Sequence, residues 1–267
     1  MSRERKYKGL FVSEMKQFLE EKHLQYNTPS FISSDPVSIP HRFTTRADRE
    51  ISGFLAASIA WGRRDLILRS AGILLEAMDN APYEFIMSAG KDDLKRISKF
   101  VHRTFNGTDC CYFMKGLHDI YSSYGSMEDV LLEGMIITGN LKDGLAHLRS
   151  RFFCGKHETR TEKHFADING GAAGKRLNMF LRWMVRRDNR GVDFGLWTRI
   201  DPSRLYIPLD IHTGNTARQL GLLSRKQNDW KAVEELTSVL REFDPADPVK
   251  YDFALFGLGV NEKFWSD

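Results

Sequence analysis

Two short segments of the chain hold the residues whose types and spacing are best suited to chemistry. Residues 169–176 read Asn-Gly-Gly-Ala-Ala-Gly-Lys-Arg and lead directly into a helical pattern. Residues 207–213 read Ile-Pro-Leu-Asp-Ile-His-Thr, which places a carboxylate two positions from an imidazole. Small residues before a helix allow a tight turn, and the amides at a helix start can hold an anion. The first segment therefore suggests anion binding, and the second offers groups for acid–base or metal chemistry.

Each segment also has a simpler structural interpretation. The glycine-rich stretch is not a Walker motif, because Gly171 to Gly174 is too short and neither Ser nor Thr follows the lysine. A plain tight turn before a helix explains it as well. Asp210 stands where a helix should begin, so an N-cap role of about 1 kcal/mol is expected. His212 is typical of a partly buried histidine, and no companion ligands at metal spacing accompany it, so we expect no metal.

Helical periodicity dominates the elements that must position these segments. Apolar residues recur at helical spacing, whereas no run alternates for long enough to indicate a strand. The predicted helices are residues 48–61, 66–78, 109–124, 175–187, 211–221 and 230–242, a helix that opens with the capping-box pattern of Ser126 and Asp129, and a last helix that begins at Asp247-Pro248. The predicted loops are residues 27–46, 88–107, 139–174 and 188–209. The sequence therefore predicts an all-α fold without internal repeats.

Length and composition limit the class of protein. A chain of 267 residues makes one large domain or two small ones. Hydrophobic residues at 42% and aromatic residues at 12% are typical of a folded globular protein rather than a disordered one. Three cysteines exclude a disulfide scaffold and have no metal-cluster spacing. No signal peptide or membrane span is indicated, so a cytoplasmic protein is expected.

Positive charge is concentrated in one part of the sequence. Residues 149–190 carry eleven Lys or Arg and four Asp or Glu, a local balance of +7 in a chain whose net charge is +4. Such a concentration is typical of proteins that bind phosphate backbones. A solvated helix face with a flexible loop explains it equally well. Charge alone therefore leaves nucleic-acid binding and a structural role both open.

The order of these segments resembles the helix-hairpin-helix DNA glycosylase superfamily, as in endonuclease III and the archaeal 8-oxoguanine glycosylases. In that superfamily a hairpin of Leu-Pro-Gly-Val-Gly type leads into a helix that opens with a catalytic lysine. A segment of Val-Asp-Thr-His type follows and holds a catalytic aspartate. Lys175 matches the lysine, Gly171 matches the first hairpin glycine, and Asp210 matches the aspartate.

The whole chain more closely resembles a family of uncharacterised bacterial conserved proteins, marked by Phe-Leu-Arg-Trp-Met-Val-Arg at 180–186 and Tyr-Asp-Phe-Ala-Leu-Phe-Gly-Leu-Gly at 251–259. The hairpin segment of this chain departs from the glycosylase pattern, since Ala173 stands where that pattern has its second glycine. Arg176 rather than Lys175 could hold the lysine position. The cysteines of the iron–sulfur cluster are missing, so neither that cluster nor any other cofactor is implied.

The resemblance implies a two-lobed helical fold. One lobe, residues 45–190, would be a helical bundle that ends in the hairpin-helix element. The second would combine residues 1–44 with residues 191–267, and the active cleft would lie between the lobes. Asp210 would stabilise an oxocarbenium-like transition state. Lys175 would attack the sugar carbon and form a Schiff base, which supports lyase activity.

The resemblance also implies a set of residues that contact DNA. The hairpin amides would hold a phosphate, and cationic side chains behind the hairpin would add further contacts. Residues that follow the turn of the first helix pair would fill the gap left by a flipped base or touch that base, although a half-buried core tryptophan is the favoured interpretation of Trp61. The expected DNA-binding residues are Gly170, Gly171, Gly174, Arg176, Arg182, Arg186, Trp61, Arg63, Arg64 and His212.

The expected function is therefore base-excision repair of damaged duplex DNA, by a glycosylase with lyase activity if Lys175 is the nucleophile. A protein with this function is expected to be associated with the nucleoid. An oxidised purine is the favoured lesion, because the spacing from Lys175 to Asp210 resembles that of the archaeal enzymes. A non-catalytic DNA- or RNA-binding module that kept the fold is the alternative. A metal-dependent hydrolase that uses Asp210 and His212 is a more distant one.

Overall fold

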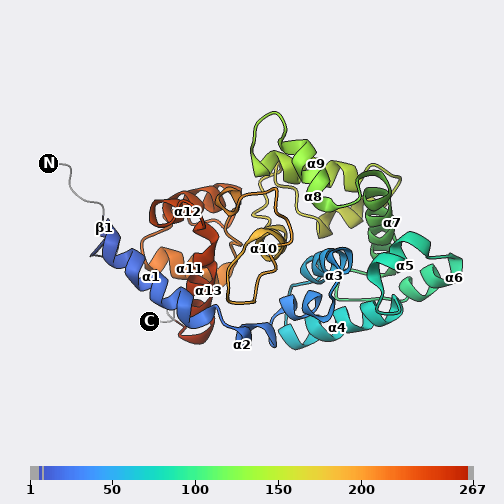
Figure 1. The fold of residues 1–267 in the computed structure, drawn as a ribbon, viewed down its shortest axis with the longest axis horizontal. Coiled ribbons are helices and arrows are strands. Elements are labelled where there is room, and N and C mark those ends of the chain that lie inside the picture. The colour runs from blue at the N-terminus through green and yellow to red at the C-terminus, as the bar shows by residue number, and fades with distance from the viewer. Residues whose placement is uncertain (1–5, 8, 264–267) are drawn as a thin grey trace. The chain divides into compact units, whose positions relative to one another are not determined.

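The computed structural model describes residues 6–7 and 9–263, and within them the chain is built from α-helices and short 3₁₀ helices (Figure 1). The exception is one antiparallel pair of two-residue strands, β1 (Lys6–Tyr7) and β2 (Leu10–Phe11). The predicted all-α fold is confirmed. No helix among the described residues is long and apolar enough to span a membrane.

The chain divides into two compact units. Among the described residues, the terminal unit comprises 6–7, 9–31 and 170–263, and the central unit comprises 32–169. The boundary precedes the glycine-rich turn, whereas the expected boundary at residue 190 placed that turn and its helix with the central segment. The helix belongs with the chain ends because its buried Arg182 pairs with Asp193 and Asp252 of the same unit.

The central unit is a group of helices that pack around aromatic side chains. Phe54, Phe113 and Phe152 lie with their ring centroids 4.9–6.0 Å apart, and Phe165 joins them from the segment before the glycine-rich turn. The elements of this unit are η1 (Pro36–Ser38), η2 (Pro40–Arg42), α3 (Arg46–Ser58), α4 (Arg64–Ala77), α5 (Pro82–Ser88), α6 (Lys91–Ile97), α7 (Gly107–Tyr124), α8 (Met127–Met135), α9 (Leu141–Phe152) and η3 (Thr159–His164).

Two of these helices lie where loops were predicted. Helix α6 begins where the Asp93 carboxylate accepts a hydrogen bond from the Gly90 amide at 2.9 Å. Helix α9 begins at Asn140, whose side chain accepts from the Lys142 amide at 2.9 Å. A Cβ added at Gly144 would lie 2.8 Å from the Leu131 carbonyl of α8, so α9 is held by close packing. Local caps and tertiary contact therefore form helices that periodicity did not indicate.

The terminal unit brings together the two ends of the described chain. Helix α1 packs against α13, where Gly257 faces the ring of Tyr26 so closely that a Cβ would be 2.2 Å from it (Figure 1). The helical elements of this unit are α1 (Val12–Tyr26), α2 (Pro29–Ile32, which spans the unit boundary), α10 (Lys175–Val185), η4 (Pro202–Arg204), α11 (Ile211–Gln219), α12 (Trp230–Phe243), η5 (Pro248–Tyr251) and α13 (Asp252–Asn261).

The expected helix-hairpin-helix element is present only in part. The glycine-rich turn is followed by α10, as predicted. The element before the turn is η3, a six-residue 3₁₀ helix that belongs to the central unit, rather than an α-helix.

Candidate functional site

The site is built from helix starts of the terminal unit. Lys175 is the first residue of α10, and the preceding Gly174 adopts φ 61°, a left-handed conformation that glycine accepts at low cost. Asp210 is the N-cap of α11, as the sequence predicted, and its Oδ1 accepts a hydrogen bond from the Thr213 amide at 2.9 Å. The fold therefore fixes where both side chains leave the backbone.

These two residues form the lysine–aspartate pair. The Nζ atom of Lys175 lies 3.9 Å from Oδ2 of Asp210, the oxygen that does not cap the helix. The two side chains are 29% and 19% exposed, so a ligand can reach them from solvent. Met179 also contacts the amine, with its sulfur 3.6 Å from Nζ. An amine and a carboxylate that face one ligand can supply a nucleophile and a negative charge.

Asp252 is a second acidic residue of this group, and sequence reasoning missed it. It is buried at the start of α13, and its Oδ2 accepts a hydrogen bond from Arg182. Burial raises the pKa of Asp252 to about 6; the charge on Asp210 adds to that rise, whereas Arg182 and Lys175 oppose it. The signal that could have found it is an acid inside the apolar stretch from Tyr251 to Leu255.

The glycine-rich turn is joined to the start of α12. Gly171 adopts φ 89°, and its carbonyl accepts a hydrogen bond from the Trp230 amide at 3.0 Å. Ala172 forms an isolated bridge with Asp229, the N-cap of α12. Gly170 is exposed at the turn. The turn is thus a fixed part of the terminal unit, and it leads directly to Lys175.

Arg176 and His212 flank the lysine–aspartate pair along the chain. Burial lowers the pKa of Arg176 to about 10, so its guanidinium stays charged at neutral pH and offers no free amine. It is the amine of Lys175 that approaches Asp210. His212 is partly buried, with its ring edge-on to Phe256 at 6.3 Å. The described residues contain no group of three or more His, Cys, Asp or Glu side chains placed to hold a metal.

Comparison with known protein families identifies the family of this chain. Residues 35–261 match the model of a family described as "Protein of unknown function (DUF2400)", a span that includes Lys175, Asp210 and Asp252. The chain belongs to this family. No curated protein and no solved structure matches the chain.

Two arginines that were expected to bind DNA have a different role in this DUF2400 chain. Arg182 and Arg186 are only 3% and 1% exposed. Arg182 pairs with Asp193 and Asp252, and Arg186 pairs with Asp188, Asp193 and Asp247. That expectation is wrong, because buried and ion-paired guanidinium groups cannot reach a phosphate in solvent.

Much of the remaining basic segment is also compensated. Arg149 pairs with Glu162 of the same segment. Arg151 and Arg160 pair with acids outside it, at Glu133 and Asp109. The local balance of +7 therefore overstates the positive charge that this part of the DUF2400 chain presents to solvent.

Trp61, Arg63 and Arg64 belong to the central unit. Trp61 is partly buried, stacked on His164 at 5.6 Å and edge-on to His102 at 5.1 Å. Arg63 is exposed and paired with Asp65 at 2.7 Å. Trp61 thus already packs against side chains of its own unit, as the core interpretation implied.

Proposed function

We propose that this chain cleaves N-glycosidic bonds in DNA, as a glycosylase that acts on a damaged base in a duplex. The observation that carries the proposal is the lysine–aspartate pair, whose Nζ and Oδ2 atoms lie 3.9 Å apart in a partly exposed position. A sugar ring placed beside both groups would meet an amine and a carboxylate at once. These are the two groups that bifunctional glycosidic chemistry requires.

The proposed reaction assigns one role to each residue. The Asp210 carboxylate stabilises positive charge as the bond between C1′ and the base weakens. The neutral Lys175 amine forms a bond to C1′ as that bond breaks, and the base leaves with the bonding electron pair and gains a proton. The new ammonium group passes a proton to the departing base, and its nitrogen lone pair then breaks the bond between C1′ and O4′. O4′ takes up a proton from water as the sugar ring opens, and the product is a Schiff base, which supports strand cleavage.

The placement of Asp210 suits this role. Its Oδ1 is occupied by the Thr213 amide, which orients the carboxylate so that Oδ2 faces Lys175. A carboxylate fixed before the substrate arrives needs little reorganisation when charge develops on the sugar.

The test uses end-labelled duplexes that each carry one modified base, with oxidised purines first. We expect base excision by the natural chain, and a covalent adduct with DNA when borohydride is present. Asp210→Asn should lower excision at least a hundredfold while it preserves the helix, because asparagine caps equally well. Lys175→Gln should abolish the covalent adduct.

Lys156→Ala is the matched control, because it removes an exposed lysine of the same basic segment in the central unit. It should leave excision unchanged. A covalent adduct that persists in Lys175→Gln would reassign the nucleophile. DNA binding without excision of any tested base would contradict the proposal and favour a non-catalytic nucleic-acid-binding module.

A further inference from the structure

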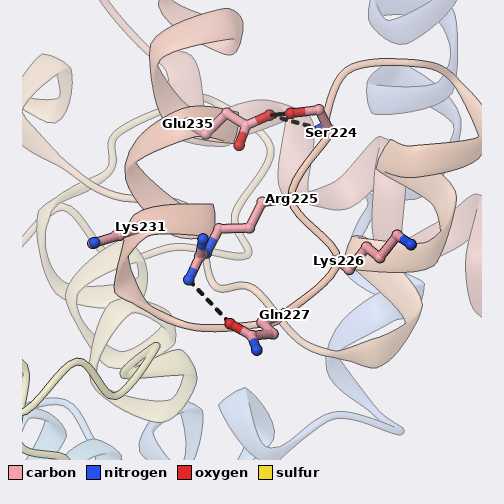
Figure 2. A pocket seen from close by; sticks show the side chains of 6 residues that line it. All are labelled: Ser224, Arg225, Lys226, Gln227, Lys231 and Glu235. Carbon is pink, nitrogen blue, oxygen red and sulfur yellow. Dashed lines mark hydrogen bonds between the residues drawn. The ribbon is translucent and has the colours of Figure 1, made fainter.

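A shallow pocket of about 440 Å³ lies on the terminal unit, at the loop before α12. It is rich in cationic side chains, and Figure 2 shows Arg225 between Lys226 and Lys231. The residues that line it are Ser224, Arg225, Lys226, Gln227, Lys231 and Glu235.

The pocket segment, Ser224–Lys231, is attached to both motifs of the candidate site. The side-chain amide of Asn228 donates to the Asp210 carbonyl at 3.1 Å. The Trp230 amide donates to the Gly171 carbonyl of the glycine-rich turn at 3.0 Å. Arg218 of α11 donates to the Arg225 carbonyl at 2.8 Å. The same loop therefore supports the backbone at Asp210 and the glycine-rich turn.

The charges around the pocket are not equivalent. Arg225 is held by the Asp229 carboxylate, with Nε 2.6 Å from Oδ1. The Glu235 carboxylate accepts from both the amide and the hydroxyl of Ser224, each at 2.6 Å. These groups already satisfy one another, so a small anion would find the Ser224 donors occupied (Figure 2).

Lys226 and Lys231 differ from these residues. Within the part of the chain that the structure describes, neither ammonium has an ion-pair partner within 4.0 Å. Figure 2 shows them extending on opposite sides of Arg225 rather than toward one point. Divergent cations on flexible stems suit successive charges of an extended polyanion better than one small anion.

We propose that the pocket segment binds the phosphodiester backbone of a nucleic acid beside the lysine–aspartate pair, with Lys226 and Lys231 as the backbone contacts. This inference rests on the proposed function for its choice of polyanion. It adds a binding surface that the sequence resemblance did not include, on a loop whose position the turn and Asp210 fix.

The test measures binding of a fluorescent 20-base-pair duplex by anisotropy between 50 and 200 mM salt. Lys226→Ala combined with Lys231→Ala should weaken binding at least tenfold at 0.1 M salt. It should also reduce the slope of log Kobs against log salt by about 2, since each lost phosphate contact removes about 0.9. Lys91→Ala combined with Lys99→Ala removes two exposed lysines of the central unit and should change neither quantity.

The outcomes separate this inference from the proposed function. Excision that persists with unchanged binding in the Lys226 and Lys231 variant would overturn the inference alone. Lysine-dependent binding without excision would overturn the glycosylase proposal alone. If inorganic phosphate at constant ionic strength displaces the duplex from the natural chain but not from the variant, the pocket binds a single anion and the inference is wrong.

Discussion

At the scale of single residues, Asp252 links the candidate site to the interior of the terminal unit. It is buried and paired with Arg182, and its charge interacts with both Asp210 and Lys175. Its carboxylate therefore takes part in the charge balance of the candidate site from a buried position. We therefore infer that Asp252 is a positioning residue that sets the electrostatics of the pair, without contact to a substrate.

The pKa of Asp252 gives a prediction for stability. Burial raises it to about 6 in the folded chain, so between about pH 4 and pH 6 the folded state binds more protons than the unfolded state. The free energy of unfolding should therefore fall as pH rises through this window, by on the order of 1–3 kcal/mol from this residue. Asp252→Asn should remove that fall, as measured by urea unfolding at fixed pH values.

Asp92→Asn is the control, because its carboxylate is 93% exposed and its loss should leave the pH dependence as it is. An unchanged pH dependence in Asp252→Asn would show that the carboxyl titrates normally in the fold.

At the scale of elements, the terminal unit depends on the contact between α1 and the segment that leads into α13. His23 of α1 is buried and makes a 3.0 Å hydrogen bond to the carbonyl of Lys250. Lys250 in turn pairs with Glu20 of α1. These contacts join α1 to η5, the element that leads directly into Asp252 and α13.

His23 predicts a pH dependence of opposite sign. Burial lowers its pKa to about 4, with help from the charges of Arg186 and Lys250. Below about pH 6.5 the unfolded state takes up a proton that the folded state does not. Stability from this residue is therefore present above pH 6.5 and is lost as pH falls toward 4, by up to about 3 kcal/mol.

His23→Gln keeps a hydrogen-bond donor for the carbonyl and should flatten this loss in urea unfolding measured from pH 7 to pH 4. His118→Gln changes an exposed histidine and should leave the loss intact. If both variants lose the same stability as pH falls, groups other than His23 cause the loss.

At the scale of the whole molecule, pairing rather than the count of charges decides how the chain meets a polyanion. The basic segment holds eleven Lys or Arg. Arg182 and Arg186 are buried, and Arg149, Arg151 and Arg160 have acidic partners. The cations that we assign to a nucleic acid are those of the pocket segment, which lies outside the basic segment.

A shallow salt dependence of DNA binding follows from this distribution. The slope of log Kobs against log salt for the natural chain should be smaller in magnitude than about 5, because about 0.9 is contributed by each phosphate contact. If all eleven basic residues contacted phosphates, the slope would approach −10. Anisotropy titrations of a duplex from 50 to 200 mM salt measure it, and a slope near −10 would contradict the assignment of the arginines to internal ion pairs.

The sequence by itself determined the features that depend on neighbouring residues. Helical periodicity predicted the all-α fold, and the residue types at 169–176 and 207–213 predicted a turn before a helix and an N-cap at Asp210. These hold because glycine at positive φ and a capping carboxylate act within one turn of the chain. The same reasoning missed α6 and α9, since their caps and packing were not visible as apolar periodicity.

The tertiary structure alone decided which residues meet. It placed Lys175 within 3.9 Å of Asp210, brought Asp252 behind them and buried Arg182 and Arg186 among acids. A count of charges gives their sum, but an ion pair depends on residues far apart in the chain, such as Arg182 and Asp252. A cation can be buried in the core only when it has an acidic partner, because moving an unpaired charge out of water costs too much free energy.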